Sequence, residues 1–216
     1  MITYLDTQVG IVQQQLEKLG LDKNTMIIFC SDNGPANSIG RNDNYFNSTA
    51  SLRGMKLDVY EGGVRVPFIV KWPAKIAKGK VSDHISATYD MMATFAELLN
   101  VKAPQNDGVS LLPTLLGTNK QKKHEYLYWE IPDKGGQLAI RMGKWKAVRT
   151  GVSRNPKAPW QLYDLEADVK ESVNLADKHP ELIKHFDAIV QKEHTTPVRK
   201  EWDIFNPVPS ASNDGE

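Results

Sequence analysis

The feature that most constrains the fold is a short apolar run followed at once by an acidic and amide turn. Residues 25–30 (TMIIFC) form a continuous, mostly apolar run. Such a run predicts a central strand buried on both faces, as in a parallel sheet. Asp32 and Asn33 follow it directly. Because ligands bind at the carboxyl ends of strands in open α/β sheets, these two side chains are candidates for a binding site.

Asp32 and Asn33 have two interpretations. With Gly34 they form a common turn tripeptide, because Asn and Gly tolerate positive φ. Their position after a buried strand instead favours a metal site, since a carboxylate and an amide carbonyl are oxygen ligands of the kind that Ca²⁺ or Mg²⁺ takes. Ca²⁺ takes roughly six to eight oxygens, so we expect most of the ligands to come from other segments.

A second candidate segment contains Arg53 and Lys56, with Arg65 shortly after them. An ordinary solvated basic stretch is one interpretation, because most Lys and Arg side chains are exposed. The alternative is an oxyanion-binding segment, in which Lys56 supplies a compact charge and Arg53 binds the anion or fixes neighbouring loops. A fixed cation beside a metal ion is an arrangement that stabilises negative charge as it develops on such an anion during a reaction.

The first half of the chain alternates helical and extended patterns. Apolar residues at steps of three and four predict an amphipathic helix that ends near Gly20. A second strand is expected over residues 64–72 and a second helix over 89–99, and the long polar loop at 36–51 is of a kind that is usually functional. The first helical pattern begins at residue 1 without a capping side chain, from which we expect a chain that begins inside an element.

The second half predicts an antiparallel meander. Glycines separate short runs rich in aromatic and β-branched residues, at residues 126–130, 137–142, 145–149 and 161–164. We expect Tyr126, Tyr128 and Trp129 to pack on the sheet, because they alternate along a strand. Pro180 opens a final helix. We therefore predict an α/β protein with domains at 1–118 and 119–196 and an irregular tail at 197–216.

Several separate motifs, in order, resemble those of type I, formylglycine-dependent sulfatases. The main ones are FCSDNGP (29–35), LRGMK (52–56) and YEGGVRVP (60–67), and further similarity extends to about residue 196. The resemblance implies part of an alkaline-phosphatase-like α/β/α domain. A small α+β subdomain with an antiparallel sheet and one packed helix would follow it.

The resemblance also assigns roles to the candidate residues. Asp32 and Asn33 match two of the family's calcium ligands, which implies Ca²⁺ as a cofactor. Lys56 matches the catalytic lysine that contacts the sulfate group, and Arg53 is expected to contribute to substrate binding. Glu61, together with Arg53 and Arg65, falls in the family's signature stretch and is expected to support that loop. The alternative is that Glu61 is buried and paired with Arg65.

The sequence departs from the family in one large respect. The family's nucleophile is a formylglycine made within Cys/Ser-x-Pro-x-Arg, and this motif does not occur in the chain. Cys30 does not fit it, and we interpret Cys30 as a small buried strand residue. The family's N-terminal acidic ligands and its catalytic histidine segment are also absent. We therefore expect a C-terminal fragment that is inactive alone, with formylglycine in a preceding part.

The implied activity is hydrolysis of sulfate esters in a sulfated carbohydrate or an aryl sulfate. One alternative is a catalytically inactive remnant or an interaction module. Another is a different hydrolase of the alkaline-phosphatase superfamily, such as a phosphatase or phosphonate hydrolase. Those enzymes usually bind two metals through additional His and Asp ligands, and the Lys56 segment argues against them.

Composition limits the partners. A net charge of +1 gives no reason to expect nucleic acid or an anionic membrane, and no apolar run is long enough for a membrane span. A single cysteine excludes an internal disulfide. We expect self-association or association with an N-terminal portion, because unpaired strand edges and apolar helix faces require partners. The sequence leaves the compartment unknown, and the family resemblance suggests a periplasmic or secreted protein.

Overall fold

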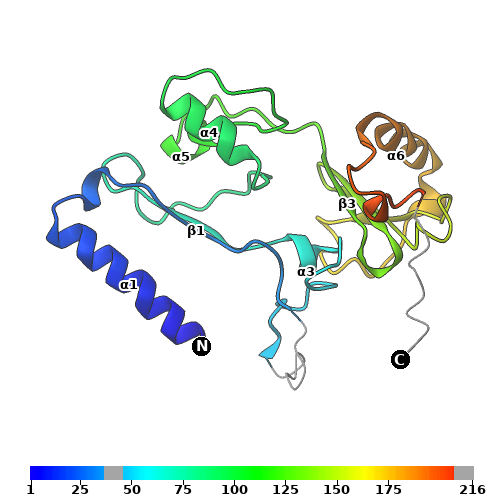
Figure 1. Cartoon of the computed structure of the whole chain (residues 1–216), viewed down its shortest axis with the longest axis horizontal. Helices are drawn as coiled ribbons and strands as arrows, with labels where there is room; N and C mark the ends of the chain where they lie inside the picture. Colours follow the sequence, from blue (N-terminus) through cyan, green and yellow to red (C-terminus); the bar gives the residue numbers. More distant parts are fainter. Residues whose placement is uncertain (37–45, 207–216) are drawn as a thin grey trace. The chain divides into compact units, whose positions relative to one another are not determined.

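The computed structural model describes residues 1–36 and 46–206, which gather into two compact units (Figure 1). Unit 1 consists of Met1–Cys30 and Pro67–His124, and unit 2 consists of Ser31–Val66 and Glu125–Glu216. All four candidate site residues belong to unit 2. The domain boundaries expected at residues 118 and 196 stay a prediction.

Unit 1 contains an antiparallel pair of strands and the first helices. Helix α1 (Ile2–Lys18) confirms the amphipathic helix, and Gly20 follows it in the left-handed region with φ of +68°. Strand β1 (Ile27–Cys30) pairs with β2 (Phe68–Lys71). No helix among the described residues is both long enough and apolar enough to cross a membrane.

The prediction of a parallel strand buried on both faces is wrong. β1 is only partly buried and runs antiparallel to β2, its one strand partner within residues 1–36 and 46–206. Cys30, which we expected to be buried, is exposed. A short apolar run looks the same in a buried parallel strand and in an antiparallel pair, so periodicity does not distinguish them.

The second predicted helix is present as α4 (Asp90–Leu98), and the short helix α5 (Leu112–Leu116) follows it. Asp90, at the start of α4, is fully buried. Its Oδ1 accepts a hydrogen bond from the Val109 backbone N–H at 2.8 Å and lies 2.8 Å from Nε2 of His124. These contacts join three separate segments of unit 1.

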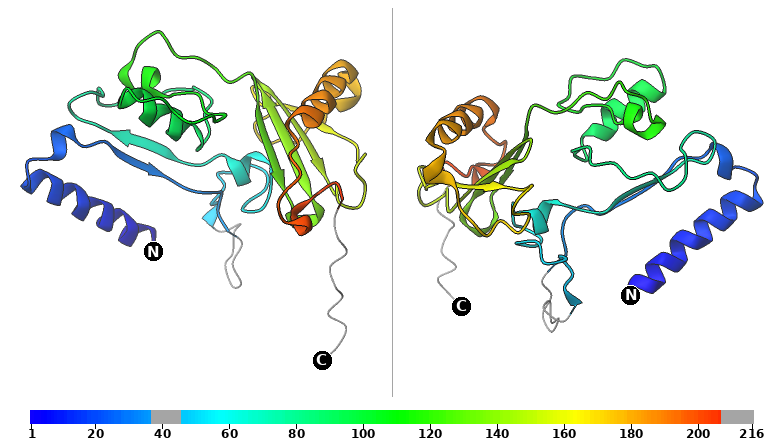
Figure 2. Two further views of the ribbon diagram at one scale, coloured as in Figure 1. Left: turned by 45° about the horizontal axis from the view of Figure 1, so that its top comes forward. Right: turned by 180° about the vertical axis from the view of Figure 1, so that it is seen from behind.

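Unit 2 contains the predicted antiparallel meander and its packed helix (Figures 1 and 2). Its strands are hydrogen-bonded in sequence order and are β3 (Leu127–Ile131), β4 (Gln137–Met142), β5 (Trp145–Thr150) and β6 (Gln161–Asp164). The final helix is α6 (Pro180–Glu193), with Pro180 in its first turn. The antiparallel sheet with one helix is therefore confirmed.

Each face of this sheet has a different cover, because alternate side chains point to opposite faces. Helix α6 covers one face with Phe186, Ile189 and Val190, which join a core with Leu138, Ile140 and Leu162. On the other face, Val59 and Tyr60 pack against Ala139, Val148 and Tyr163. The aromatic residues of β3 divide as predicted, since Tyr128 packs on the first core and Trp129 on the second. The segment that carries the predicted cations is thus fixed to the sheet through Val59 and Tyr60.

Candidate active site

The turn after β1 presents two oxygen donors. Oδ1 of Asp32, an exposed residue, accepts a hydrogen bond from the backbone N–H of Asn33 at 2.9 Å. The side-chain amide nitrogen of Asn33 donates to the carbonyl oxygen of Gly34 at 2.9 Å. Among the described residues, no hydrogen bond reaches Oδ2 of Asp32 or Oδ1 of Asn33. These two oxygens fit Ca²⁺ as part of its coordination shell of roughly six to eight oxygens.

The segment that carries Lys56 lies directly against this turn. The backbone N–H of Lys56 donates a hydrogen bond to the carbonyl oxygen of Pro35 at 3.0 Å. The backbone N–H of Gly34 donates to the carbonyl oxygen of Gly63 at 2.9 Å. The two motifs predicted to share a site are therefore hydrogen-bonded to each other within unit 2. That the Lys56 ammonium points toward Asp32 and Asn33 stays a prediction.

Glycines permit this close approach. A Cβ atom on Gly34 would lie 1.8 Å from the carbonyl oxygen of Gly62, and one on Gly62 would lie 2.2 Å from that of Gly54. A Cβ atom on Gly63 would lie 2.0 Å from the carbonyl oxygen of Asp58. Because each clash is with backbone, no side-chain rotation relieves it. Only glycine fits at these three positions.

Replacing Gly34 with Ala is therefore expected to push the Lys56 segment away from the Asp32 turn. The free energy of unfolding should fall by about 1–3 kcal/mol, as for other overpacked sites. Urea denaturation measures this value. Gly10→Ala is the matched control, because a Cβ atom on Gly10 within α1 meets nothing within 4 Å and Ala favours a helix. A Gly34→Ala protein as stable as the unmodified chain would contradict the close packing.

A closed loop carries Lys56, and we call residues 53–62 the Lys56 loop. Its base is closed by the backbone N–H of Gly62, which donates to the carbonyl oxygen of Arg53 at 2.7 Å. Nη1 of Arg53 donates to the Tyr163 hydroxyl at 2.8 Å and to the Glu171 carbonyl oxygen at 2.9 Å. These bonds support the loop, whereas the contact of Arg53 with substrate stays a prediction.

Glu61, at the start of helix α3 (Glu61–Val64), is 1% exposed. Its Oε1 accepts a hydrogen bond from Nζ of Lys146 at 2.8 Å, and its Oε2 lies 3.6 Å from nitrogens of both Arg65 and Arg141. The interpretation of Glu61 as a buried residue paired with Arg65 agrees with this geometry. Lys146, which makes the shorter contact, is missing from the residues predicted from the sequence.

The alternation of strand β5 contains the signal that would have identified Lys146. Lys146 and Val148 are two residues apart on that strand, so their side chains share the face that packs against Val59 and Tyr60. Lys146 is fully buried. A buried lysine requires an acidic partner, and the loop that packs on this face contains Glu61. An inward-facing lysine on a strand is therefore a sign of a buried acidic partner.

Glu171 completes the buried cluster. It is fully buried, its Oε2 accepts the Glu61 backbone N–H at 2.8 Å, and its Oε1 lies 3.4 Å from Nζ of Lys146. Burial raises the pKa of Glu171, and the neighbouring charge of Lys146 opposes that rise. Arg65 and Arg141 bring two further positive charges to Glu61. The two acids thus have cations beside them, which is the condition under which charges are tolerated inside a protein.

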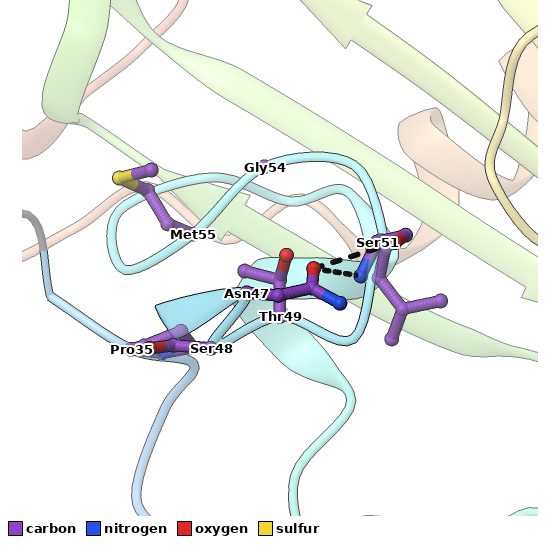
Figure 3. A pocket seen from close by; sticks show the side chains of 8 residues that line it. Pro35, Asn47, Ser48, Thr49, Ser51, Gly54 and Met55 are labelled. Atoms are coloured by element: carbon purple, nitrogen blue, oxygen red, sulfur yellow. Dashed lines mark hydrogen bonds between the residues drawn. The ribbon is translucent and has the colours of Figure 1, made fainter. Parts of the chain in front are cut away.

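A pocket of about 380 Å³ lies next to these segments in unit 2 (Figure 3). Polar side chains form much of its wall, and the lining residues are Pro35, Asn47, Ser48, Thr49, Ser51, Leu52, Gly54 and Met55. Oδ1 of Asn47 accepts a hydrogen bond from the Ser51 backbone N–H at 2.9 Å (Figure 3). The pocket borders both predicted motifs but is not lined by Asp32, Asn33 or Lys56. Within residues 1–36 and 46–206, no group of three or more His, Cys, Asp and Glu side chains is placed to hold a metal ion.

The fold and the site together define an alkaline-phosphatase-like α/β protein. One solved structure comes from a description of the metabolism of multiple glycosaminoglycans by Bacteroides thetaiotaomicron. It superposes on this chain with a TM-score of 0.71 and 32% sequence identity. The match covers 87% of this chain and 42% of that one. The predicted α/β fold class is confirmed.

Two family models match the chain. "Sulfatase" matches residues 1–101, and "N-sulphoglucosamine sulphohydrolase, C-terminal" matches residues 55–195. The chain belongs to the sulfatase family and corresponds to its C-terminal portion. The family resemblance inferred from the motifs is therefore confirmed.

Curated relatives carry sulfatase names. The chain is 33% identical over 218 residues to N-acetylgalactosamine-6-O-sulfatase of Bacteroides thetaiotaomicron, a match that covers 90% of this chain and 41% of the relative. It is 34% identical over 193 residues to human arylsulfatase A, covering 79% of this chain and 37% of the relative. The chain thus spans about two fifths of the length of these relatives.

Proposed function

We propose that this chain supplies part of the calcium- and sulfate-binding site of an enzyme that hydrolyses sulfate esters. The observation that carries the proposal is the pair of backbone hydrogen bonds from Lys56 to Pro35 and from Gly34 to Gly63. They hold a lysine-bearing loop against a turn with two oxygen donors. The names of the two curated relatives support a sulfated carbohydrate or an aryl sulfate as the substrate.

Each residue has a distinct proposed task. The carboxylate of Asp32 and the amide oxygen of Asn33 would hold Ca²⁺, which supplies positive charge for the sulfate oxygens when bound. The Lys56 ammonium would place a compact charge on the same anion and stabilise the charge that develops in the transition state. Arg53 would keep the Lys56 loop closed and contact the substrate.

The nucleophile is proposed to come from outside these 216 residues. The family's formylglycine would supply it, and the chain contains no Cys/Ser-x-Pro-x-Arg motif. We therefore propose that this chain alone does not turn over sulfate esters. We also propose that it associates with an N-terminal portion or with itself, since α1 exposes apolar side chains such as Ile2, Leu5 and Val12.

The binding part of this proposal is tested by titrating CaCl₂ and then Na₂SO₄ into ¹⁵N-labelled chain. Calcium should shift the backbone amide signals of Asn33 and Gly34, and sulfate should shift those of Met55 and Lys56. Asp32→Ala removes a charged ligand and should weaken calcium binding about tenfold or more. Asp107→Ala, which removes an exposed carboxylate of unit 1, is the matched control.

Two results would contradict the proposal. One is an absence of calcium-dependent shifts at Asn33 and Gly34. The other is an equal loss of calcium affinity in Asp32→Ala and Asp107→Ala, which would indicate general charge attraction. Either result would favour the alternative of an inactive remnant or an interaction module.

A further inference from the structure

One residue contacts both ends of the Lys56 loop. The backbone carbonyl oxygen of Glu171 accepts a hydrogen bond from Nη1 of Arg53 at 2.9 Å. Its carboxylate Oε2 accepts the backbone N–H of Glu61 at 2.8 Å. Glu171 lies 110 residues beyond Glu61 in the sequence. A single distant residue therefore fixes the two points between which Lys56 is held.

The backbone of Glu171 is held in an unfavourable conformation. Its φ is +55°, in the left-handed region that non-glycine residues rarely adopt. The carboxylate of Asp168 fixes the surrounding turn, because its Oδ2 accepts backbone N–H groups of Ser172 at 2.6 Å and Val173 at 2.8 Å. Such strain persists when the surroundings require it and is found at functional sites. At Glu171 it directs the carbonyl and the carboxylate of one residue to the same loop.

Lys146 holds the Glu171 carboxylate in place. Its Nζ lies between the two buried acids, 2.8 Å from Oε1 of Glu61 and 3.4 Å from Oε1 of Glu171. With one carboxylate oxygen of Glu171 near Lys146, the other accepts the Glu61 N–H. The two oxygens of the Glu171 carboxylate thus face different groups of the buried cluster, Lys146 and the Glu61 backbone.

We propose that Glu171 is a positioning residue that sets the place of Lys56 relative to a bound sulfate group. The inference rests on the proposed function of Lys56. If the carboxylate contact is withdrawn, the backbone of Glu61 loses its hydrogen bond to Glu171, while the Glu61 side chain stays paired with Lys146. The Gly62 N–H to Arg53 bond then remains as the closure at the base. Lys56 should leave its position, and sulfate affinity should fall although Glu171 does not touch the anion.

Two conservative variants separate positioning from a purely electrostatic role. Glu171→Gln keeps the length of the side chain and an acceptor for the Glu61 N–H, but removes the charge. Glu171→Asp keeps the charge and withdraws the acceptor by one methylene. Glu166→Asp, an exposed residue near the same turn, is the matched control. Sulfate affinity is measured in calcium-loaded chain from the amide shifts of Met55 during a titration with Na₂SO₄.

Positioning predicts that Glu171→Asp weakens sulfate binding about five- to tenfold, the value of one hydrogen bond. Glu171→Gln and Glu166→Asp should stay within about twofold of the unmodified chain. In a Lys56→Ala background, Glu171→Asp should have no further effect, because it acts through Lys56. A melting curve of each variant verifies that it is folded.

Three results would overturn the inference. They are a loss of sulfate affinity in Glu171→Gln, unchanged affinity in a folded Glu171→Asp, and equal effects of Glu171→Asp with and without Lys56. If Glu171→Asp does not fold, the affinity of Glu171→Gln decides, since positioning requires that it be retained. Failure of the proposed function would be recognised separately. In that case Lys56→Ala alone would leave sulfate affinity unchanged.

Discussion

Replacing Lys146 with Met is expected to lower the free energy of unfolding of unit 2 by about 3–5 kcal/mol. Met has a similar length, so little volume is lost, but the charge between Glu61 and Glu171 disappears. Both carboxylates are nearly or fully inaccessible to water. Leaving them buried without their shared cation costs far more than losing an exposed ion pair. Urea denaturation followed by tryptophan fluorescence measures the change, since Trp129, Trp145 and Trp160 all lie in unit 2.

Two further proteins test whether charge is the cause. Lys146→Met combined with Glu171→Gln should recover part of the lost stability, because it removes one of the two uncompensated acids. Lys144→Met removes a neighbouring lysine that is partly exposed and paired with Asp164, and its effect should be small. A Lys146→Met protein no less stable than Lys144→Met would show that the buried cluster is not held by charge.

The largest expected effect on activity comes from Lys56→Ala. In the proposed sulfate-ester hydrolase, it should lower kcat for an aryl sulfate about 100- to 1000-fold, the usual loss when one fixed donor to a developing negative charge is removed. KM should change less, because the interaction is strongest in the transition state. Initial rates with 4-nitrophenyl sulfate over a range of substrate concentrations separate the two parameters.

Lys102→Ala is the control for this experiment, since Lys102 is an exposed lysine of unit 1. Its rate should equal that of the unmodified enzyme. A Lys56→Ala enzyme that keeps more than about half of its kcat would exclude Lys56 from transition-state stabilisation. Turnover of 4-nitrophenyl sulfate by this chain alone would contradict the proposal that the nucleophile lies elsewhere.

Local sequence patterns predicted the elements of unit 2 well. The runs at 137–142 and 161–164 match β4 and β6, because Gly-containing turns bound each run and alternate residues face two covers. The start of the final helix was also predicted from a local signal, since Pro180 fits a first helical turn. Such features are encoded within about ten residues of sequence and do not depend on distant partners.

The errors and omissions concern partners far apart in the chain. The pairing of β1 with β2 joins residues 27–30 to 68–71, and nothing within the first run specifies an antiparallel neighbour. Glu171 was not singled out because its surroundings, VKESVN, read as a polar turn. Its burial arises from Lys146 and from the base of the Lys56 loop, neither of which is near it in sequence. Motifs indicated Asp32, Asn33 and Lys56 as candidates, but not the residues that hold their segments.

The proximity of the Lys56 ammonium to a metal ion at Asp32 and Asn33 can be measured by paramagnetic broadening. Lysine side chains are labelled by reductive methylation with ¹³C-formaldehyde, the Lys56 signal is assigned from Lys56→Arg, and Mn²⁺ is added in small steps. We expect the Lys56 signal to broaden before those of Lys75 and Lys102, and Asp32→Ala to abolish this selectivity. A Lys56 signal that stays sharp while Mn²⁺ broadens other lysines would place the ammonium away from the metal and contradict a shared site.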